Sequence, residues 1–141
     1  MPIQFILLPL FVQVALTFFL IFWTARARIG AIRGGQASMK DTALGQQNWP
    51  ARATQIANCY NSQFQIPVLF YVLTILAIMT RHADILFLVM AWLFVITRLV
   101  HAYIHTGTNY VPHRFNAFAA GVLILLLMWI ILAVRLIAGL P

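Results

Sequence analysis

Residues 85–106 read ILFLVMAWLFVITRLVHAYIHT, an apolar run whose second half carries basic and titratable side chains. Crossing a membrane takes about 20 apolar residues in a helix, so the stretch is long enough to span one. Arg98, His101 and His105 are three and four residues apart, which places them on one face of a helix. The stretch therefore predicts a transmembrane helix with a polar face near its carboxyl end.

The composition extends this prediction to the whole chain. Of its 141 residues, 63% are hydrophobic and 8% are charged, far less charge than a soluble domain of this size carries. Four windows are long enough to cross a membrane: residues 3–25, 53–80, 85–106 and 115–138. The first window lacks the basic start and the cleavage pattern of a signal peptide, so we expect a retained helix. We predict one all-α integral membrane domain, residues 1–141, folded as a four-transmembrane-helix bundle.

The basic residues are distributed unevenly between the predicted loops. The formal net charge is +7, and most cations follow the first and third windows. Because cytoplasmic loops carry an excess of Lys and Arg, we expect both termini outside and these two segments in the cytoplasm. No soluble basic face or nucleic-acid-binding module accompanies the charge, so we expect no nucleic acid partner. The cations in question are Arg26, Arg28, Arg33, Lys40, Arg52 and Arg114.

A second polar stripe lies in the first half of the window 53–80. Thr54, Asn58, Asn61 and Gln65 are spaced four, three and four residues apart, which confines them to one helix face. This helix enters from the cytoplasmic side, where the helix 85–106 ends. The two polar stripes are therefore expected at the same depth in the membrane.

Arg98 decides between two interpretations of this region. A buried arginine costs roughly 3 kcal/mol or more unless it finds a partner or its side chain reaches the headgroups. In the structural interpretation Arg98 reaches the headgroups and the two histidines form hydrogen bonds between helices. In the functional interpretation the stripes form a site for an anionic ligand, which we favour because no acidic residue lies at that depth.

Other chemistries fit the residues less well. Two histidines four apart supply half of a zinc site, but the chain has only two acidic residues to complete one. Two histidines on one helix face cannot ligate opposite sides of a haem. A Ser-His-Asp triad lacks its acid, and a transporter is expected to have interrupted helices in related halves. We expect no metal site.

Three sequence features resemble the MAPEG family, the membrane-associated proteins in eicosanoid and glutathione metabolism. They are NSQFQIP at 61–67, RLVHAYIH at 98–105, and the His-Arg pair that ends at Arg114. The resemblance covers essentially the whole chain and is that of a bacterial-type member, so it implies a bacterial inner membrane. It implies a homotrimer of four-helix subunits, with glutathione bound between subunits at the cytoplasmic side, and lipids and a lipophilic small molecule as further partners.

The resemblance also assigns roles to residues. It implies that Arg114 stabilises the glutathione thiolate and that Arg26 binds a carboxylate. Asn61 and Pro67 match the family's Asn and Pro in the second helix, and Arg98 and His101 match a variant of the motif in the third. The predicted glutathione-binding or anion-binding residues are Arg26, Asn58, Asn61, Gln65, Arg98, His101 and His105.

Two positions depart from the family pattern. Ala57 and Phe64 stand where the family usually has an arginine and a glutamate. The predicted function is a glutathione-dependent transferase or peroxidase that acts on lipophilic substrates. The alternative is a non-catalytic member that binds a lipid or another anion, or a small subunit of a larger membrane assembly.

Overall fold

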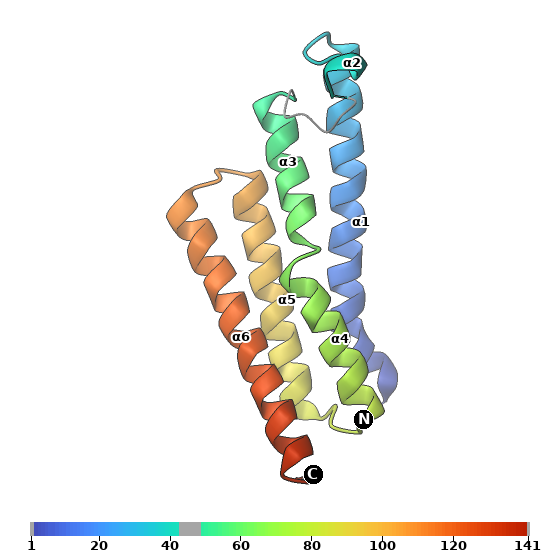
Figure 1. Cartoon of the computed structure of the whole chain (residues 1–141), viewed down its shortest axis with the longest axis vertical. Coiled ribbons are helices and arrows are strands. Elements are labelled where there is room, and N and C mark those ends of the chain that lie inside the picture. The colour runs from blue at the N-terminus through green and yellow to red at the C-terminus, as the bar shows by residue number, and fades with distance from the viewer. Residues whose placement is uncertain (1, 43–48, 141) are drawn as a thin grey trace.

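The computed structural model describes residues 2–42 and 49–140, which form a bundle of long helices (Figure 1). Within these described ranges, four segments are long and apolar enough to cross a membrane, and α3 (Ala51–Ser62) and α4 (Ile66–Met79) share one of them. Both termini lie at the lower end of the bundle in Figure 1, as an even number of crossings requires. The predicted four-transmembrane-helix bundle is confirmed. The helices are α1 (Ile3–Arg33), α2 (Met39–Thr42), α3 (Ala51–Ser62), α4 (Ile66–Met79), α5 (Ile85–Thr106) and α6 (Val111–Ile137).

The predicted helix boundaries agree best for α5. Its bounds coincide with the window 85–106, and Asp84 caps its first turn by accepting a hydrogen bond from the Phe87 backbone N–H at 3.0 Å. By contrast, α1 continues to Arg33, beyond the apolar window. α6 begins at Val111 rather than at 115, with Pro112 in its first turn. The predicted window 115–138 left Pro112 outside the helix, but a proline fits the first turn because its missing N–H would have no helical partner there.

The second transmembrane segment is interrupted, where the apolar window 53–80 predicted one continuous helix. α3 ends at Ser62 and α4 starts at Ile66, so the interruption precedes the proline. A proline ring clashes with the carbonyl four residues earlier, which is that of Gln63, and supplies no N–H to it. The backbone N–H groups of Gln63, Phe64 and Gln65 each bond three residues back, at 3.0, 3.1 and 3.3 Å.

Buried polar side chains stabilise this interruption. The Gln13 amide on α1 donates to Gln63 Oε1 at 2.8 Å, and both side chains are almost fully buried. Gln63 Nε2 in turn donates to the Cys59 carbonyl at 2.9 Å. In a membrane, backbone groups freed from a helix must find partners inside the protein, and these amides supply them.

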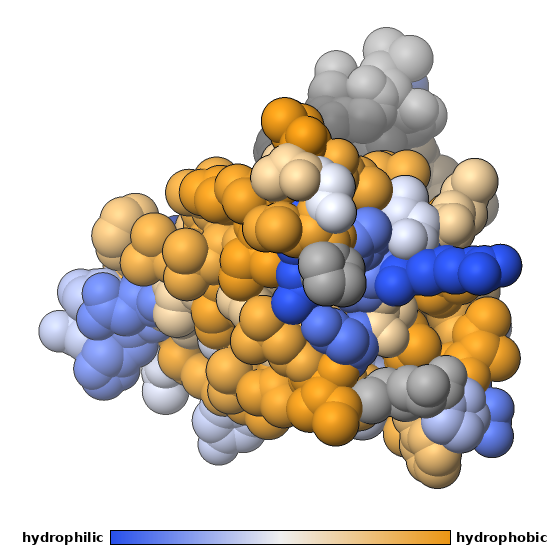
Figure 2. Space-filling view, turned by 90° about the horizontal axis from the view of Figure 1, so that it is seen from below, coloured by the Kyte–Doolittle hydropathy of each residue, from blue (hydrophilic) through white to orange (hydrophobic). Residues whose placement is uncertain are grey.

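The apolar core lies below the interruption, between α4, α5 and α6. Phe70 and Phe94 stack with their ring centroids 4.8 Å apart, and Leu73, Ala91 and Val95 pack around them. Many large apolar side chains point outward, as the lipid-facing surface of a transmembrane bundle requires. Figure 2 shows the lower end of the bundle, where apolar residues surround a small hydrophilic group.

Gly121 sets how closely α6 approaches α5. A Cβ built at Gly121 would lie 2.9 Å from Thr97 Oγ1, whose hydroxyl already donates to the Phe94 carbonyl at 2.6 Å. Small residues such as this glycine allow transmembrane helices to pack backbone against backbone.

We therefore expect Gly121→Ala to destabilise the fold by about 1–3 kcal/mol, because the added methyl group must displace Thr97 or the α6 backbone. The measurement is the apparent melting temperature in detergent. Gly30→Ala is the matched control, since a Cβ there meets nothing within 4 Å and alanine favours the helix. An equal response of both variants would contradict this role for Gly121.

Candidate functional site

A cavity of about 450 Å³ opens between α3, α5 and α6, at the end of the bundle opposite the termini. It lies beside the interruption between α3 and α4, so side chains from the end of α3 face those from the last turns of α5. The start of α6 closes the third side. The lining residues are Asn58, Asn61, Ser62, Gln65, His101, His105, Val111, Arg114, Phe115 and Phe118.

The cavity brings together six of the eight residues that the sequence singled out. Asn58, Asn61 and Gln65 present exposed amides from one side, and His101, His105 and Arg114 line the other sides. The two polar stripes therefore lie at one depth, as their spacing predicted. Arg98 and Arg26 do not line this cavity.

Arg98 lies directly behind the cavity wall. It is 1% exposed, so its side chain does not extend to the headgroups and the structural interpretation of Arg98 is wrong. Its Nη2 donates to the Ser62 carbonyl at 3.3 Å and to Ser62 Oγ at 3.0 Å, and Ser62 itself lines the cavity. Its Nε and Nη1 have no hydrogen-bond partner among the described residues. A guanidinium that is desolvated and only partly bonded favours negative charge nearby.

Arg114 is held at the mouth of the cavity by the turn between α5 and α6. Its Nη1 donates to Asn109 Oδ1 at 2.8 Å. Asn109 adopts a left-handed backbone conformation with φ of 52°, which asparagine tolerates better than most residues. The hydrogen bond restricts a long side chain and fixes a positive charge at the cavity.

The two histidines face the cavity without bonding across it. Their ring centroids lie 5.4 Å apart in an edge-to-face arrangement, and His101 also lies 5.9 Å from the Phe118 ring. Nδ1 of each ring is buried and has no partner among the described residues. Within the same residues no three side chains of metal-binding type converge.

The carboxyl end of α5 is capped by two residues that sequence reasoning did not select. Arg52 donates to the Thr106 carbonyl. Gln55 Nε2 donates to the carbonyls of His105 and Gly107 at 2.7 and 3.0 Å. These carbonyls form the electronegative end of the helix. Arg52 and Gln55 thus neutralise the electronegative end of α5, which lies beside the cavity and would otherwise attract a cation. The signal available in the sequence was their spacing, since Arg52, Gln55 and Asn58 follow one another at intervals of three residues.

The cations of α1 lie away from this cavity. Arg26 is exposed on the outer face of α1. Arg28 lies 5.0 Å from the centre of the Trp49 ring and lines a separate hollow of about 420 Å³ between α1 and α3. Ala57 lines this second hollow, and Phe64 packs edge-on against Tyr60 at 5.1 Å. The two departures from the family pattern therefore face away from the main cavity in the single chain.

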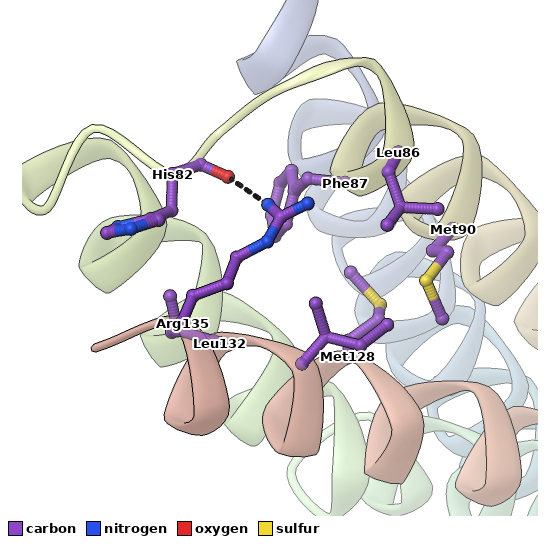
Figure 3. A pocket seen from close by; sticks show the side chains of 8 residues that line it. His82, Leu86, Phe87, Met90, Met128, Leu132 and Arg135 are labelled. Atoms are coloured by element: carbon purple, nitrogen blue, oxygen red, sulfur yellow. Dashed lines mark hydrogen bonds between the residues drawn. The ribbon is translucent and has the colours of Figure 1, made fainter. Parts of the chain in front are cut away.

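A small cavity at the opposite end serves a structural role (Figure 3). It measures about 20 Å³, space for about one water molecule, and apolar side chains of α5 and α6 form most of its wall. Arg135 Nη1 lies 2.9 Å from Asp84 Oδ2 and 3.5 Å from the His82 carbonyl. This ion pair ties the end of α6 to the start of α5.

Asp84 gives this ion pair a defined pH dependence. Burial raises the pKa of the Asp84 carboxyl, but the hydrogen bond from Phe87 and the charge of Arg135 outweigh burial and hold that pKa below its ordinary value of 3.8. A carboxyl whose pKa is lowered by folding contributes stability above its unfolded pKa, and this contribution disappears as the pH falls through the folded pKa.

We therefore expect Asp84→Asn to lower the apparent melting temperature at pH 7, and we expect this difference to shrink as the pH falls through the folded pKa of Asp84, which lies below 3.8. Asparagine still caps α5, so the variant removes only the charge. The effect is modest, below about 1 kcal/mol, because the carboxylate is 47% exposed. A difference that did not shrink as the pH was lowered through this range would mean that the ion pair is not its source.

Comparison with known protein families matches residues 6–134 to the MAPEG family, nearly the whole chain. No curated protein and no solved structure matches the chain. The resemblance found in the sequence is thereby confirmed.

Proposed function

Because the chain belongs to the MAPEG family, we propose that it is a membrane-embedded transferase or peroxidase that uses a thiol of the glutathione class on lipophilic substrates. The observation that supports this most is the cavity itself, which joins Arg114 to three amides and two imidazoles at one membrane face. Carboxylates of the thiol are bound by these donors, and charge-assisted hydrogen bonds to arginine are among the stronger ones available.

Arg114 is the catalytic residue in this proposal. A thiol of pKa about 8.5 is mostly protonated at neutral pH, and an adjacent guanidinium favours its deprotonated form. The thiolate is the nucleophile. In transfer, its sulfur forms a bond to an electrophilic carbon while the leaving group departs with the electron pair of the bond that breaks.

An apolar groove offers a place for the second substrate. It has a volume of about 420 Å³ and lies between α4 and α6, lined by Ile66, Leu69, Val122, Leu125, Leu126 and Trp129. Phe115 and Phe118 of the cavity and Val122, Leu125 and Trp129 of the groove repeat at spacings of three and four, so they share one face of α6. A lipophilic electrophile in the groove therefore has its reactive end directed toward the cavity.

Assembly and orientation complete the proposal. In a homotrimer, the exposed Arg26 is available to reach a ligand held by a neighbouring copy, which accounts for its distance from the cavity of its own chain. Cations are concentrated at the end of α1, at Lys40 and Arg52, and at Arg114 in the first turn of α6. This distribution supports a cytoplasmic location of the cavity, with both termini outside, in a bacterial inner membrane.

We expect Arg114→Ala to lower kcat/KM for conjugation of a generic electrophile about 10- to 100-fold, the effect of losing one charged hydrogen-bond donor. The pH at which the rate is half-maximal moves upward, because the thiolate is no longer stabilised. Arg33→Ala, which removes an equal charge from the end of α1, is the control. Activity that equals the wild type in both variants would refute the role of Arg114.

The groove also predicts how activity depends on the length of the alkyl chain of the lipophilic substrate. Leu126 lines the groove and is 51% exposed, so a larger tryptophan side chain at this position partly fills the groove. We therefore expect Leu126→Trp to raise the KM for electrophiles with long alkyl chains. The KM of a small water-soluble electrophile stays unchanged. Steady-state kinetics with an alkyl series measure both, and an equal effect on all members would place the lipophilic substrate elsewhere.

A second candidate function follows from Ala57 and Phe64, which remove two charges that the family usually has. In this alternative the cavity binds a lipid headgroup or another anion without catalysis, or the chain serves as a small subunit of a larger assembly. Native mass spectrometry separates the two candidates. A retained phospholipid together with no turnover of any thiol supports the alternative, and thiol-dependent turnover excludes it.

A further inference from the structure

Two imidazoles share the cavity with Arg114. His101 and His105 lie on successive turns of α5, and their ring centroids are 5.4 Å apart. Nδ1 of each ring is buried, so each ring meets the cavity that it lines through Nε2 and the adjoining ring edge. An imidazole can accept a proton and release it again near neutral pH, which a guanidinium cannot do. The cavity therefore combines a fixed cation with groups that can move a proton.

Depth along the bundle distinguishes the two rings. α5 and α6 pack side by side and are joined by a short turn (Figure 1). Along the helix axes, His105 lies about 2 Å from this turn, Arg114 about 5 Å and His101 about 8 Å. The Phe118 ring, 5.9 Å from that of His101, comes next, and the apolar groove begins beyond it at Val122. His101 is thus the imidazole that lies between the arginine and the groove.

Fixed positive charges determine which form of His101 is favoured. Arg98 precedes it by three residues on the same face of α5, and Arg114 lines the same cavity from α6. These charges oppose a third, so they favour the neutral ring, which can accept a proton. A thiolate beside Arg114 offsets the repulsion, and the repulsion returns when the sulfur loses its charge. A proton held by His101 is then readily released.

We infer that His101 is a second catalytic residue, which carries the proton of the thiol to the oxygen atom that the electrophile releases. This inference rests on the proposed function and specifies a class of second substrate, electrophiles in which a carbon–oxygen bond breaks. The observation that supports it most is the position of the ring, between the group that stabilises the sulfur anion and the groove that holds the electrophile.

The proton is conserved through the reaction of an epoxide. As Arg114 stabilises the sulfur anion, the thiol proton moves to Nε2 of His101. The sulfur then forms a bond to a ring carbon of the epoxide, and the carbon–oxygen bond breaks with its electron pair on oxygen. Nε2 gives the proton to that oxygen, which leaves a hydroxyl group, a thioether and a neutral imidazole. A chloride leaving group takes no proton, and in that case the proton of His101 passes to water.

The test compares two electrophiles that carry the same nitrophenyl group. The epoxide of para-nitrophenyl glycidyl ether opens to an oxygen anion, whereas para-nitrobenzyl chloride releases chloride. Both are assayed with glutathione and the full chain in detergent, for the wild type and for His101→Gln, which keeps a polar side chain. We expect this variant to lower kcat/KM at least 10-fold more for the epoxide than for the chloride, because proton transfer by a positioned side chain contributes roughly 10²–10⁴-fold.

His105→Gln is the matched control, since it removes the imidazole on the other side of Arg114. We expect it to affect the two electrophiles alike and to leave the ratio of their kcat/KM values unchanged. An equal loss for both electrophiles in His101→Gln overturns the inference. A ratio that His105→Gln alters as strongly as His101→Gln does so too.

The wild type alone gives a second test, which does not depend on the folding of a variant. In deuterium oxide, we expect kcat to fall more for the epoxide than for the chloride, because a proton moves to the leaving atom only in the epoxide reaction. Equal isotope effects for the two electrophiles contradict the role of His101.

Turnover of the chloride keeps these tests distinct from that of the proposed function. If the wild type conjugates the chloride but His101→Gln leaves the ratio unchanged, only the inference fails. If the wild type conjugates neither electrophile, the proposed function fails and the inference fails with it.

Discussion

The hydrogen bonds from Arg98 to Ser62 are the interaction on which this site depends. A guanidinium that is 1% exposed within a transmembrane helix requires acceptors inside the protein. Ser62 supplies two of them, its carbonyl and its hydroxyl, at 3.3 and 3.0 Å. That carbonyl lies at the end of α3, where the helix stops ahead of Pro67. The interruption and the buried charge are therefore parts of one arrangement.

The same arrangement shapes the cavity. Because α3 ends at Ser62, Gln65 lies outside regular helix and shares the cavity wall with Asn58 and Asn61. Arg52 and Gln55, one to two turns earlier on α3, cap the carboxyl end of α5. A single helix thus supplies amides to the cavity wall and neutralises the electronegative end of its neighbour. The result is a polar cavity that is positively charged on balance.

Much of this was predictable from the sequence. The four membrane crossings follow from apolar runs, and the meeting of the two polar stripes follows from helical spacing combined with alternating direction. The contribution of Arg114 was suggested by resemblance to the family. These features are set by periodicity and by length, which a sequence shows directly.

Other features depend on local competition between contacts. The sequence did not reveal that α3 ends before Pro67, since that depends on Gln13 and Gln63 meeting from different helices. The sequence placed Arg98 among the ligand-binding residues. In the structure Ser62 lines the cavity, and Arg98 donates to Ser62 from behind the cavity wall. Pro112 was assigned to a loop, although a first helical turn accepts proline equally well. Arg26, which the resemblance placed with the ligand, is exposed on α1 and does not line the cavity.

The most direct test of this account is the stabilisation of the fold by an acidic ligand in the presence and absence of the Arg98 charge. Melting temperatures of wild type and Arg98→Met are measured against rising concentrations of S-hexylglutathione, since a ligand that binds the folded state raises stability with concentration. If the buried charge supports the site, the wild type shows a concentration-dependent rise, and Arg98→Met remains folded but needs at least 10-fold more ligand for an equal rise. An identical rise in both proteins would contradict the account.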